Sequence, residues 1–291
     1  MSAPDGLLVV DKPSGWTSHD VVGRTRRLAR TKKVGHAGTL DPMATGVLVL
    51  GIGRATRLLG HLTLTDKAYD ATVRLGATTI TDDAEGDVLE RRDASGVSDE
   101  ALAAAVGELT GELDQVPSAV SAVKVAGVRS YARVRAGEDV ALAPRQVRVA
   151  RFDVLARRGD DVDVRVEVSS GTYVRALARD LGAALGVGAH LTALRRTRVG
   201  PFALEAARSL EELTGDEVVD AAVLGLDDAV AASFPRRDLS EQEAGDLAHG
   251  RRLAPSGAPG ARGAFAPDGR CIALVEDTGG AARPLVVFAP A

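Results

Sequence analysis

Apolar and polar side chains alternate along three stretches of the chain, residues 66–76, 147–156 and 162–168. A two-residue period is typical of strands that bury one face, so each stretch predicts such a strand. The residues Gly159, Asp160 and Asp161 separate the last two stretches and predict a hairpin. Uninterrupted apolar runs at residues 7–10 and 47–50 predict two further short strands.

Apolar residues recur every three or four positions in other stretches, and this spacing predicts helices. Three helices are expected to begin at a capping serine: Ser18 to about Thr31, Ser98 to Gly111, and Ser240 to Gly250. A fourth is expected from Tyr173 to Leu185, and Ser209 and Glu212 have the spacing of a capping box. The acidic stretch 82–97 predicts an exposed loop.

Short apolar runs punctuated by Pro and Gly fill the chain after residue 235. We therefore expect a domain boundary at Phe234-Pro235, with a large domain over residues 1–235 and a small β-rich domain over 236–291. Because strands and helices both occur along the large domain, the pattern predicts an α+β fold.

Composition narrows the possible chemistry. The single cysteine, Cys271, excludes an internal disulfide and a multi-cysteine zinc site, and the five histidines lack the spacing of metal ligands. No phosphate-loop or dinucleotide-binding motif is present, so we expect neither a metal nor a cofactor. The sequence has no signal peptide and no apolar run long enough to span a bilayer, which predicts a cytoplasmic protein without membrane contact.

Charge is unevenly distributed along the chain. The formal net charge is −4, but residues 82–114 carry −9 and residues 211–228 carry −7, which leaves +12 for the rest. Residues 24–33 contain six bases and no acid. Such a run is typical either of a solvated helix face or of a surface that follows phosphates, so nucleic acid is not excluded as a partner.

The candidate for chemistry is Asp41, in a loop punctuated by Gly35, Gly38, Pro42 and Gly46. Gly and Pro fix backbone paths that other residues follow only with difficulty. A carboxylate on a rigid loop beside a core strand is a plausible catalytic group. The alternative is a tight turn in which the aspartate bonds its own backbone.

Residues 35–48 read G-H-A-G-T-L-D-P-M-A-T-G-V-L and meet every fixed position of the catalytic signature of the TruB family of tRNA pseudouridine synthases. Three further segments resemble the family in the same order: D-K-P-S-G-W-T-S at 11–18, S-G-T-Y-V-R at 170–175 and G-A-H-L-T-A-L-R-R at 188–196. The resemblance covers roughly residues 5–235. It implies the pseudouridine synthase fold, a mixed and mostly antiparallel sheet flanked by helices, followed by a small PUA-like domain.

The resemblance implies three catalytic residues. Asp41 would act on the ribose while the N1 glycosidic bond of uridine is exchanged for a bond from C5. Arg175 would hold the Asp41 carboxylate in its ionised form, and Tyr69 would stack on the uracil. Read without the resemblance, Tyr69 is a sheet tyrosine with a surface hydroxyl, and Arg175 is an exposed helix residue that pairs with Asp180 or Glu167.

Four more residues are implied at the substrate-binding site: His36, Tyr173, Leu194 and Lys12. His36 is similar to a histidine that holds the RNA loop open around a flipped base, and Tyr173 to a pocket residue. Leu194 would line the pocket wall, and Lys12 would support the active loop. Where many members have a tyrosine, this chain has Val120.

The resemblance also implies a substrate and its partners. We expect an isomerase that acts on uridine 55 in the T-loop of tRNA, binds the T-arm through a thumb-like insertion at about 124–148 and contacts the acceptor stem through residues 236–291. We expect a monomer that needs no guide RNA or protein partner. The alternative is an RNA-binding or tRNA-folding module with the same fold whose main role is not catalytic.

Overall fold

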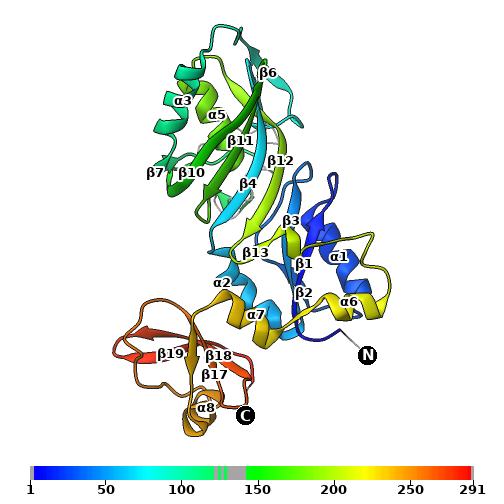
Figure 1. Cartoon of the computed structure of the whole chain (residues 1–291), viewed down its shortest axis with the longest axis vertical. Helices are drawn as coiled ribbons and strands as arrows, with labels where there is room; N and C mark the ends of the chain where they lie inside the picture. The colour runs from blue at the N-terminus through cyan, green and yellow to red at the C-terminus, as the bar shows by residue number, and fades with distance from the viewer. Residues whose placement is uncertain (1–2, 121–123, 126–127, 130–141, 290–291) are drawn as a thin grey trace. The chain divides into compact units, whose positions relative to one another are not determined.

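The computed structural model describes residues 3–120, 124–125, 128–129 and 142–289 (Figure 1). The chain divides into two compact units. Unit 1 comprises Met1–Asp41, Val47–Thr63 and Gly200–Ala291, and unit 2 comprises Pro42–Gly46 and Leu64–Val199. Within the described ranges, no helix is long and apolar enough to cross a membrane.

Unit 2 is organised on a sheet whose neighbouring long strands are all antiparallel. In order across the sheet they are β12 (Ala189–Val199), β4 (Lys67–Leu75), β11 (Asp161–Val168), β10 (Arg145–Arg158) and β7 (Gly111–Gln115). Thr45 and Gly46, the first residues of β3 (Thr45–Ile52), pair in parallel with Arg195 and Arg196 of β12. The sheet is therefore mixed and mostly antiparallel, and the expected α+β class is confirmed.

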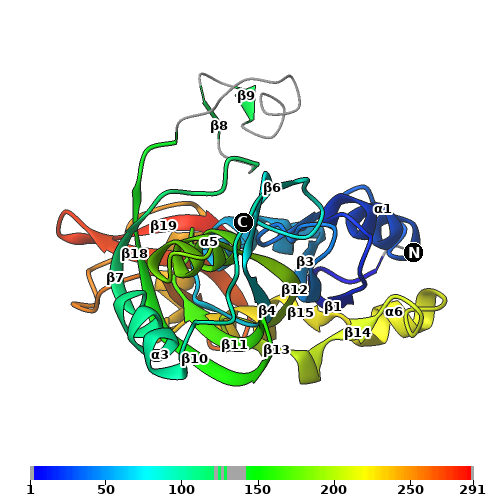
Figure 2. The ribbon, with the colours of Figure 1, turned by 90° about the horizontal axis from the view of Figure 1, so that it is seen from above.

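Helices α3 (Asp99–Glu108) and α5 (Val174–Ala184) lie on one face of this sheet (Figure 2). On β4 the buried side chains of Tyr69, Ala71 and Val73 alternate with more exposed ones. A strand places alternate residues on opposite faces, so the buried set faces the helices. Smaller elements of this unit are β5 (Ala77–Thr79) paired with β6 (Val88–Arg91), and β8 (Lys124–Val125) paired with β9 (Val128–Arg129).

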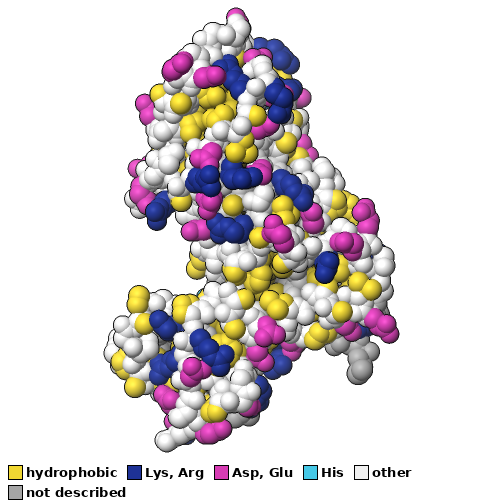
Figure 3. Space-filling view, viewed as in Figure 1, with side chains coloured by type: hydrophobic (Ala, Val, Ile, Leu, Met, Phe, Trp, Pro, Cys, Tyr) yellow, Lys and Arg dark blue, Asp and Glu magenta, His cyan; other side chains and the backbone are white. Residues whose placement is uncertain are grey.

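The opposite face of the sheet carries charged pairs across neighbouring strands. Arg165 binds Asp70 at 2.7 Å, Arg74 binds Asp161 at 2.7 Å and Arg198 binds Glu167 at 2.8 Å. Basic and acidic side chains are interspersed over this part of the surface in Figure 3. Because these pairs are solvated, each contributes at most about 1 kcal/mol to stability. This face of the sheet is therefore exposed to solvent, and the core lies on the face that the helices cover.

Unit 1 contains a second group of strands around β1 (Gly6–Lys12), which lies beside β3. β1 pairs in parallel with β14 (Arg208–Ser209) and antiparallel with β15 (Leu224–Gly225), and β2 (Val34–His36) pairs antiparallel with β3. The remaining elements of this part are α1 (Ser18–Leu28), η1 (Gly53–Leu58), α2 (Leu59–Thr63), β13 (Phe202–Ala203), η2 (Leu204–Ala206), α6 (Asp216–Ala222) and α7 (Leu226–Ser233).

The C-terminal part of unit 1 forms a small four-stranded sheet with one helix. Its strands are β16 (Arg236–Asp238), β17 (Arg262–Phe265), β18 (Cys271–Thr278) and β19 (Ala281–Val287), in that order, and its helix is α8 (Glu241–Ala248). Leu247, Ile272 and Ala273 belong to its apolar core. Arg54 of η1 donates to the carbonyl of Phe288 at 3.1 Å, which fastens the end of this module to the N-terminal strands.

Several helix boundaries confirm the sequence predictions. Ser98 caps α3 by accepting from the Ala101 N–H, and Ser240 caps α8 in a reciprocal capping box with Glu243. Helix α5 lies between the predicted limits, with Tyr173 as its N-cap and Leu185 as its C-cap. The bonds of the predicted Ser209–Glu212 capping box also form, although the helix that follows begins only at Asp216.

The first predicted helix is shifted at both ends. Thr17, not Ser18, is the N-cap of α1, because Thr17 forms a capping box with Asp20. The helix ends at Leu28 rather than Thr31 because Arg30 adopts a φ of 51°. The Thr31 N–H then bonds the Arg26 carbonyl, which is the Schellman pattern of a terminated helix.

Two other expectations are wrong in part. The stretch 82–97 is not simply an exposed loop, because Asp82 and Asp83 are buried and residues 88–91 form β6. Helix α3 stops at Glu108, and Gly111 opens β7 instead of closing the helix. Of the expected insertion at 124–148, residues 145–148 belong to β10, and residues 126–127 and 130–141 lie outside the described part of the chain.

Gly46 gives a test of the β3–β12 contact. It has a φ of 99°, and a Cβ at this position would lie 2.1 Å from the Arg196 carbonyl oxygen. We expect Gly46→Ala to lower the free energy of unfolding by about 2 kcal/mol more than Gly111→Ala, because the clash with the Arg196 carbonyl adds to the positive-φ strain that both positions share. Gly111 is the matched control because its φ is 109° and nothing lies within 4 Å of the added Cβ. Equal losses in urea unfolding would contradict the close approach.

Candidate active site

The residues predicted for the site are divided between the two units. Lys12, His36 and Asp41 belong to unit 1, and the other four belong to unit 2: Tyr69, Tyr173, Arg175 and Leu194. Each group is built by its own set of strands and helices.

The peptide that leads into Asp41 is held by a buried hydroxyl. Ser18 is 1% exposed. Its Oγ donates to the Leu40 carbonyl at 3.1 Å and accepts the Leu40 N–H at 2.9 Å. Because Thr17 caps α1, the Ser18 side chain is available for this contact. Both backbone groups of the residue before the half-buried Asp41 are therefore fixed.

Lys12 and His36 terminate two strands of the same unit. The Lys12 side chain is fully buried, and its Nζ donates to the carbonyls of Pro13 at 3.0 Å and Trp16 at 2.5 Å. Lys12 therefore closes the turn that precedes α1. His36 is half-buried at the end of β2, with its ring 5.5 Å from that of His19 in an edge-to-face arrangement.

In unit 2, Tyr69 and Leu194 occupy the helix-bearing face of the sheet. Tyr69 is opposite Arg196, and Leu194 is opposite Ala71, in the antiparallel register of β4 and β12. Residues opposite each other in this way point to the same face. Tyr69 is 7% exposed, so most of its side chain is buried against this face.

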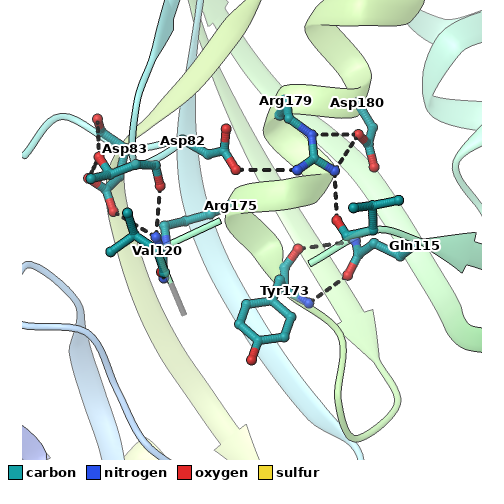
Figure 4. Close-up of polar contacts among 10 residues, drawn as sticks. Asp82, Asp83, Gln115, Val120, Tyr173, Arg175, Arg179 and Asp180 are labelled. Carbon is teal, nitrogen blue, oxygen red and sulfur yellow. Dashed lines mark hydrogen bonds and ion pairs between the residues drawn. The ribbon is translucent and has the colours of Figure 1, made fainter. Parts of the chain in front are cut away.

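Arg175 is buried in a shell of oxygen atoms (Figure 4). Its Nη1 donates to the Thr81 carbonyl at 2.7 Å and lies 3.4 Å from a carboxylate oxygen of Asp83. Its Nη2 donates to the Val120 carbonyl at 2.9 Å. The interpretation as an exposed residue paired with Asp180 or Glu167 is therefore wrong. Asp180 binds Arg179 and Glu167 binds Arg198 instead.

Asp82 is a buried carboxylate in a strained conformation. Its φ is 59°, which is uncommon outside glycine, and its carbonyl accepts the Leu191 N–H at 3.0 Å. A carboxylate oxygen lies 3.4 Å from Arg179 on α5. Burial raises the pKa of Asp82, and the charges of Arg179 and Arg175 offset this effect only in part.

A second buried ionisable group lies close to Tyr69 in the sequence. Lys67 begins β4, is 7% exposed and donates from its Nζ to the Thr65 carbonyl at 2.8 Å. Burial and then the charge of Arg196 lower the pKa of Lys67 to about 8. The helix-bearing face of unit 2 therefore contains an amine that can lose its proton at moderately alkaline pH.

Sequence reasoning missed the acids and the amide that surround the start of α5. Asp82 and Asp83 lie in a run of acids that reads as solvated, and Gln115 ends a strand without any motif. One signal was present: Arg175 and Arg179 are four residues apart, so they share a helix face that requires acceptors. No cluster of potential metal ligands occurs among the described residues.

The raised pKa of Asp82 predicts a pH-dependent effect of Asp82→Asn on stability. Below the ordinary pKa of 3.8 the carboxyl is neutral in both the folded and the unfolded protein. As pH rises through the window above 3.8, the unfolded chain ionises first, so the wild type loses stability relative to the variant. We expect the Tm of the variant minus that of the wild type to increase from pH 4 to pH 7 by a few degrees, about 2–4 °C for each kcal/mol. A Tm difference that falls over this range would contradict the burial of an ionisable Asp82.

Three family descriptions match successive parts of the chain. Residues 26–174 match the TruB family pseudouridylate synthase N-terminal domain, residues 175–231 match the tRNA pseudouridylate synthase B C-terminal domain, and residues 234–289 match the tRNA pseudouridine synthase II C-terminal domain. Proteins named tRNA pseudouridine synthase B from Arthrobacter sp. (strain FB24) and Thermobifida fusca (strain YX) are each 59% identical. They align over 98% of this chain and over 97% and 99% of their own lengths.

Solved structures with the same fold include Cbf5 in a Cbf5-Nop10-Gar1 complex. The match has a TM-score of 0.77 and 29% identity, and it covers 98% of this chain and 85% of that chain. A chain from an H/ACA RNP bound to a substrate RNA containing 2'-deoxyuridine matches with a TM-score of 0.74 and 28% identity, over 98% and 85% of the two chains. The domain matches, the near-complete alignments at 59% identity and the arrangement of strands and helices together show that this chain belongs to the TruB family of pseudouridylate synthases.

Proposed function

We propose that this TruB-family isomerase converts uridine 55 in the T-loop of tRNA into pseudouridine, with Asp41 acting on the ribose. The class of enzyme follows from the family, and tRNA as the substrate follows from relatives named tRNA pseudouridine synthase B. The alternative, an RNA-binding module whose main role is not catalytic, is not favoured by these relatives. The position in the tRNA and the residue roles are our proposal.

The reaction needs one carboxylate and no group donor, because the bond between N1 of the uracil and C1′ of the ribose breaks and C5 of the same uracil then bonds to C1′ and loses its proton. Asp41 performs its part in the ionised form, either by attack on C1′ or by removal of the 2′ proton. The observation that supports this assignment is that the residue before Asp41 is fixed in place. The Ser18 hydroxyl makes hydrogen bonds to both backbone groups of Leu40. A fixed backbone aims the carboxylate before the substrate arrives.

Arg175 is proposed as the partner that keeps Asp41 ionised. A guanidinium can bind a carboxylate through two parallel hydrogen bonds, and an opposite charge favours the ionised form. The other bonds of Arg175, to the carbonyls of Thr81 and Val120, would hold the guanidinium plane in one orientation. Tyr69 is proposed to stack on the uracil.

The remaining site residues are proposed to receive the flipped nucleotide. A base must leave its stack before an enzyme can act on it. In this proposal His36 holds the RNA loop open, Tyr173 and Leu194 line the pocket, and Lys12 supports the active loop through the turn that it closes.

We propose a catalytic domain over residues 1–235 and a PUA-like RNA-binding domain over 236–291. The T-arm would bind the first domain and the acceptor stem the second. We further propose that the enzyme acts as a monomer without a guide RNA or a protein partner. The basic residues of the run 24–33, on and after α1, are candidates for phosphate contacts.

Loss of the Asp41 carboxylate tests its proposed catalytic role. Asp41→Asn should lower the single-turnover rate of pseudouridine formation on a T-arm transcript by at least about 10³-fold, because the amide neither attacks C1′ nor accepts the 2′ proton. Its affinity for the transcript should stay within about threefold of the wild type, since binding is distributed over many phosphate contacts. Asp160→Asn, the same substitution in the exposed β10–β11 turn, is the control. Substantial turnover by Asp41→Asn would remove Asp41 from the catalytic role.

Replacement of the Arg175 guanidinium by an ammonium tests its proposed role. Arg175→Lys should lower the single-turnover rate by about 10²-fold or more, because one ammonium cannot serve the Thr81 and Val120 carbonyls and a carboxylate in the same planar geometry. Arg91→Lys, an exposed position on β6, is the matched control. If the kinetics of Arg175→Lys equal those of the control, the proposed role of Arg175 is wrong.

A further inference from the structure

The helix that carries Tyr173 and Arg175 begins without a cap of its own. Tyr173 is the N-cap of α5, and its side chain makes no capping hydrogen bond. The third helical residue, where a capping box has Glu or Gln, is Ala176. A side chain from another part of the chain binds the backbone of this N-cap residue instead.

This side chain belongs to Gln115, the last residue of β7. Its Oε1 accepts the Tyr173 N–H at 2.8 Å, and its Nε2 donates to the Tyr173 carbonyl at 3.2 Å (Figure 4). The side chain is buried, and the residue is 3% exposed. One amide therefore binds both backbone groups of the N-cap residue from a strand 58 positions away in the sequence. The Tyr173 carbonyl also accepts the Leu177 N–H of the helix at 3.1 Å, so the amide is a second partner for that carbonyl.

Two arginines of α5 bind the residues that follow Gln115. Arg179 Nη2 donates to the Val116 carbonyl at 2.7 Å, and Arg175 Nη2 donates to the Val120 carbonyl at 2.9 Å. The segment 115–120 is thus joined to α5 at its first, second and last residues. The Tyr173 ring points away from Gln115 (Figure 4), so the amide holds the backbone of Tyr173 and not its ring.

We infer that Gln115 is a positioning residue for the isomerisation: by holding both backbone groups of Tyr173, it sets the direction in which the Tyr173 ring and the Arg175 guanidinium leave the first turn of α5. This inference rests on the function proposed above. It assigns a role to the amide itself, because only a group with a donor and an acceptor side by side can make both bonds.

Two substitutions separate this role from simple space filling. Gln115→Met has a similar length and makes neither hydrogen bond. Gln115→Glu has the same shape. Its ionised carboxylate accepts the Tyr173 N–H but repels the Tyr173 carbonyl, whereas the neutral carboxylic acid makes both bonds. Function should therefore return to Gln115→Glu as pH falls and the carboxyl is protonated.

Charged groups on the surrounding elements influence the pH at which the carboxyl of Gln115→Glu is protonated. They are Arg179 and Asp180 on α5, Asp114 on β7 itself, and Arg145, which is opposite position 115 on β10. Burial favours the neutral acid, while the helix start and the two arginines favour the carboxylate. Gln146→Glu, an exposed position on β10, is the matched control for the same change of charge.

The experiment measures single-turnover pseudouridine formation on a T-arm transcript from pH 6 to pH 8.5, with each variant divided by the wild type at the same pH. We expect Gln115→Met to be reduced by about 10²-fold at every pH, as a misplacement of about 1 Å can cause. We expect the ratio for Gln115→Glu to rise at least about tenfold from pH 8.5 to pH 6, and that for Gln146→Glu to stay flat. Transcript affinity should change by less than about threefold in all of them.

A rate for Gln115→Met within twofold of the wild type would overturn the inference, and so would a flat ratio for Gln115→Glu. If Gln115→Met does not fold, the pH profile of Gln115→Glu still decides. Hydrogen exchange provides a readout that needs no catalysis, because the Tyr173 N–H should exchange faster in Gln115→Met than in the wild type. A wild type that forms no pseudouridine would defeat the proposed function instead, and the exchange result would remain valid for the contact.

Discussion

A guanidinium inside a protein domain requires acceptors in every direction in which it donates, and Arg175 imposes this requirement on much of unit 2. The Thr81 carbonyl and the Asp83 carboxylate come from one segment, and the Val120 carbonyl comes from another. Those segments must reach α5 before the charge can be buried. Asp82, with its φ of 59°, and Arg179, which binds Asp82 and the Val116 carbonyl, lie where these segments meet α5.

The site is oriented mainly by side chains that bind backbone atoms. Ser18 binds both groups of Leu40, Gln115 binds both groups of Tyr173, and Lys12 binds the carbonyls of a turn. A backbone atom cannot change rotamer, so such bonds fix a position more firmly than contacts between two side chains. In a chain with only 3% aromatic residues, which leaves few large rings to wedge elements apart, this is an effective way to obtain rigidity.

Local patterns were sufficient to predict β1, β3, β4, β10, β11 and several helix ends, because alternation and capping act within a few residues, but they did not reveal β7 or β12. The hairpin at Gly159 and the capping box at Ser240 are examples. The role of Ser18 could not be read locally, since its partner Leu40 is 22 positions away and Thr17 competes for the cap. The roles of Asp83 and Gln115 could not be predicted for the same reason, because both residues contact α5, which lies far along the chain. The resemblance to family motifs identified Asp41 and Arg175 as candidate site residues, but it did not identify the residues that hydrogen-bond to them or to their neighbours.

The way in which unit 1 is assembled has a consequence for how the chain folds. Val10 of β1 pairs with Arg208 of β14, roughly 200 residues later, whereas the long strands of unit 2 find their partners within a continuous stretch. During synthesis from the N-terminus, β1 therefore leaves the ribosome long before its neighbours β14 and β15 exist. Such distant pairing is slow, and it leaves one edge of β1 without its partners in the meantime. β1 can pair early with β3 on one side, but its other edge gains β14 and β15 only after the body of unit 2 has been synthesised, so the last step of folding in unit 1 joins the two ends of the catalytic-signature part of the chain.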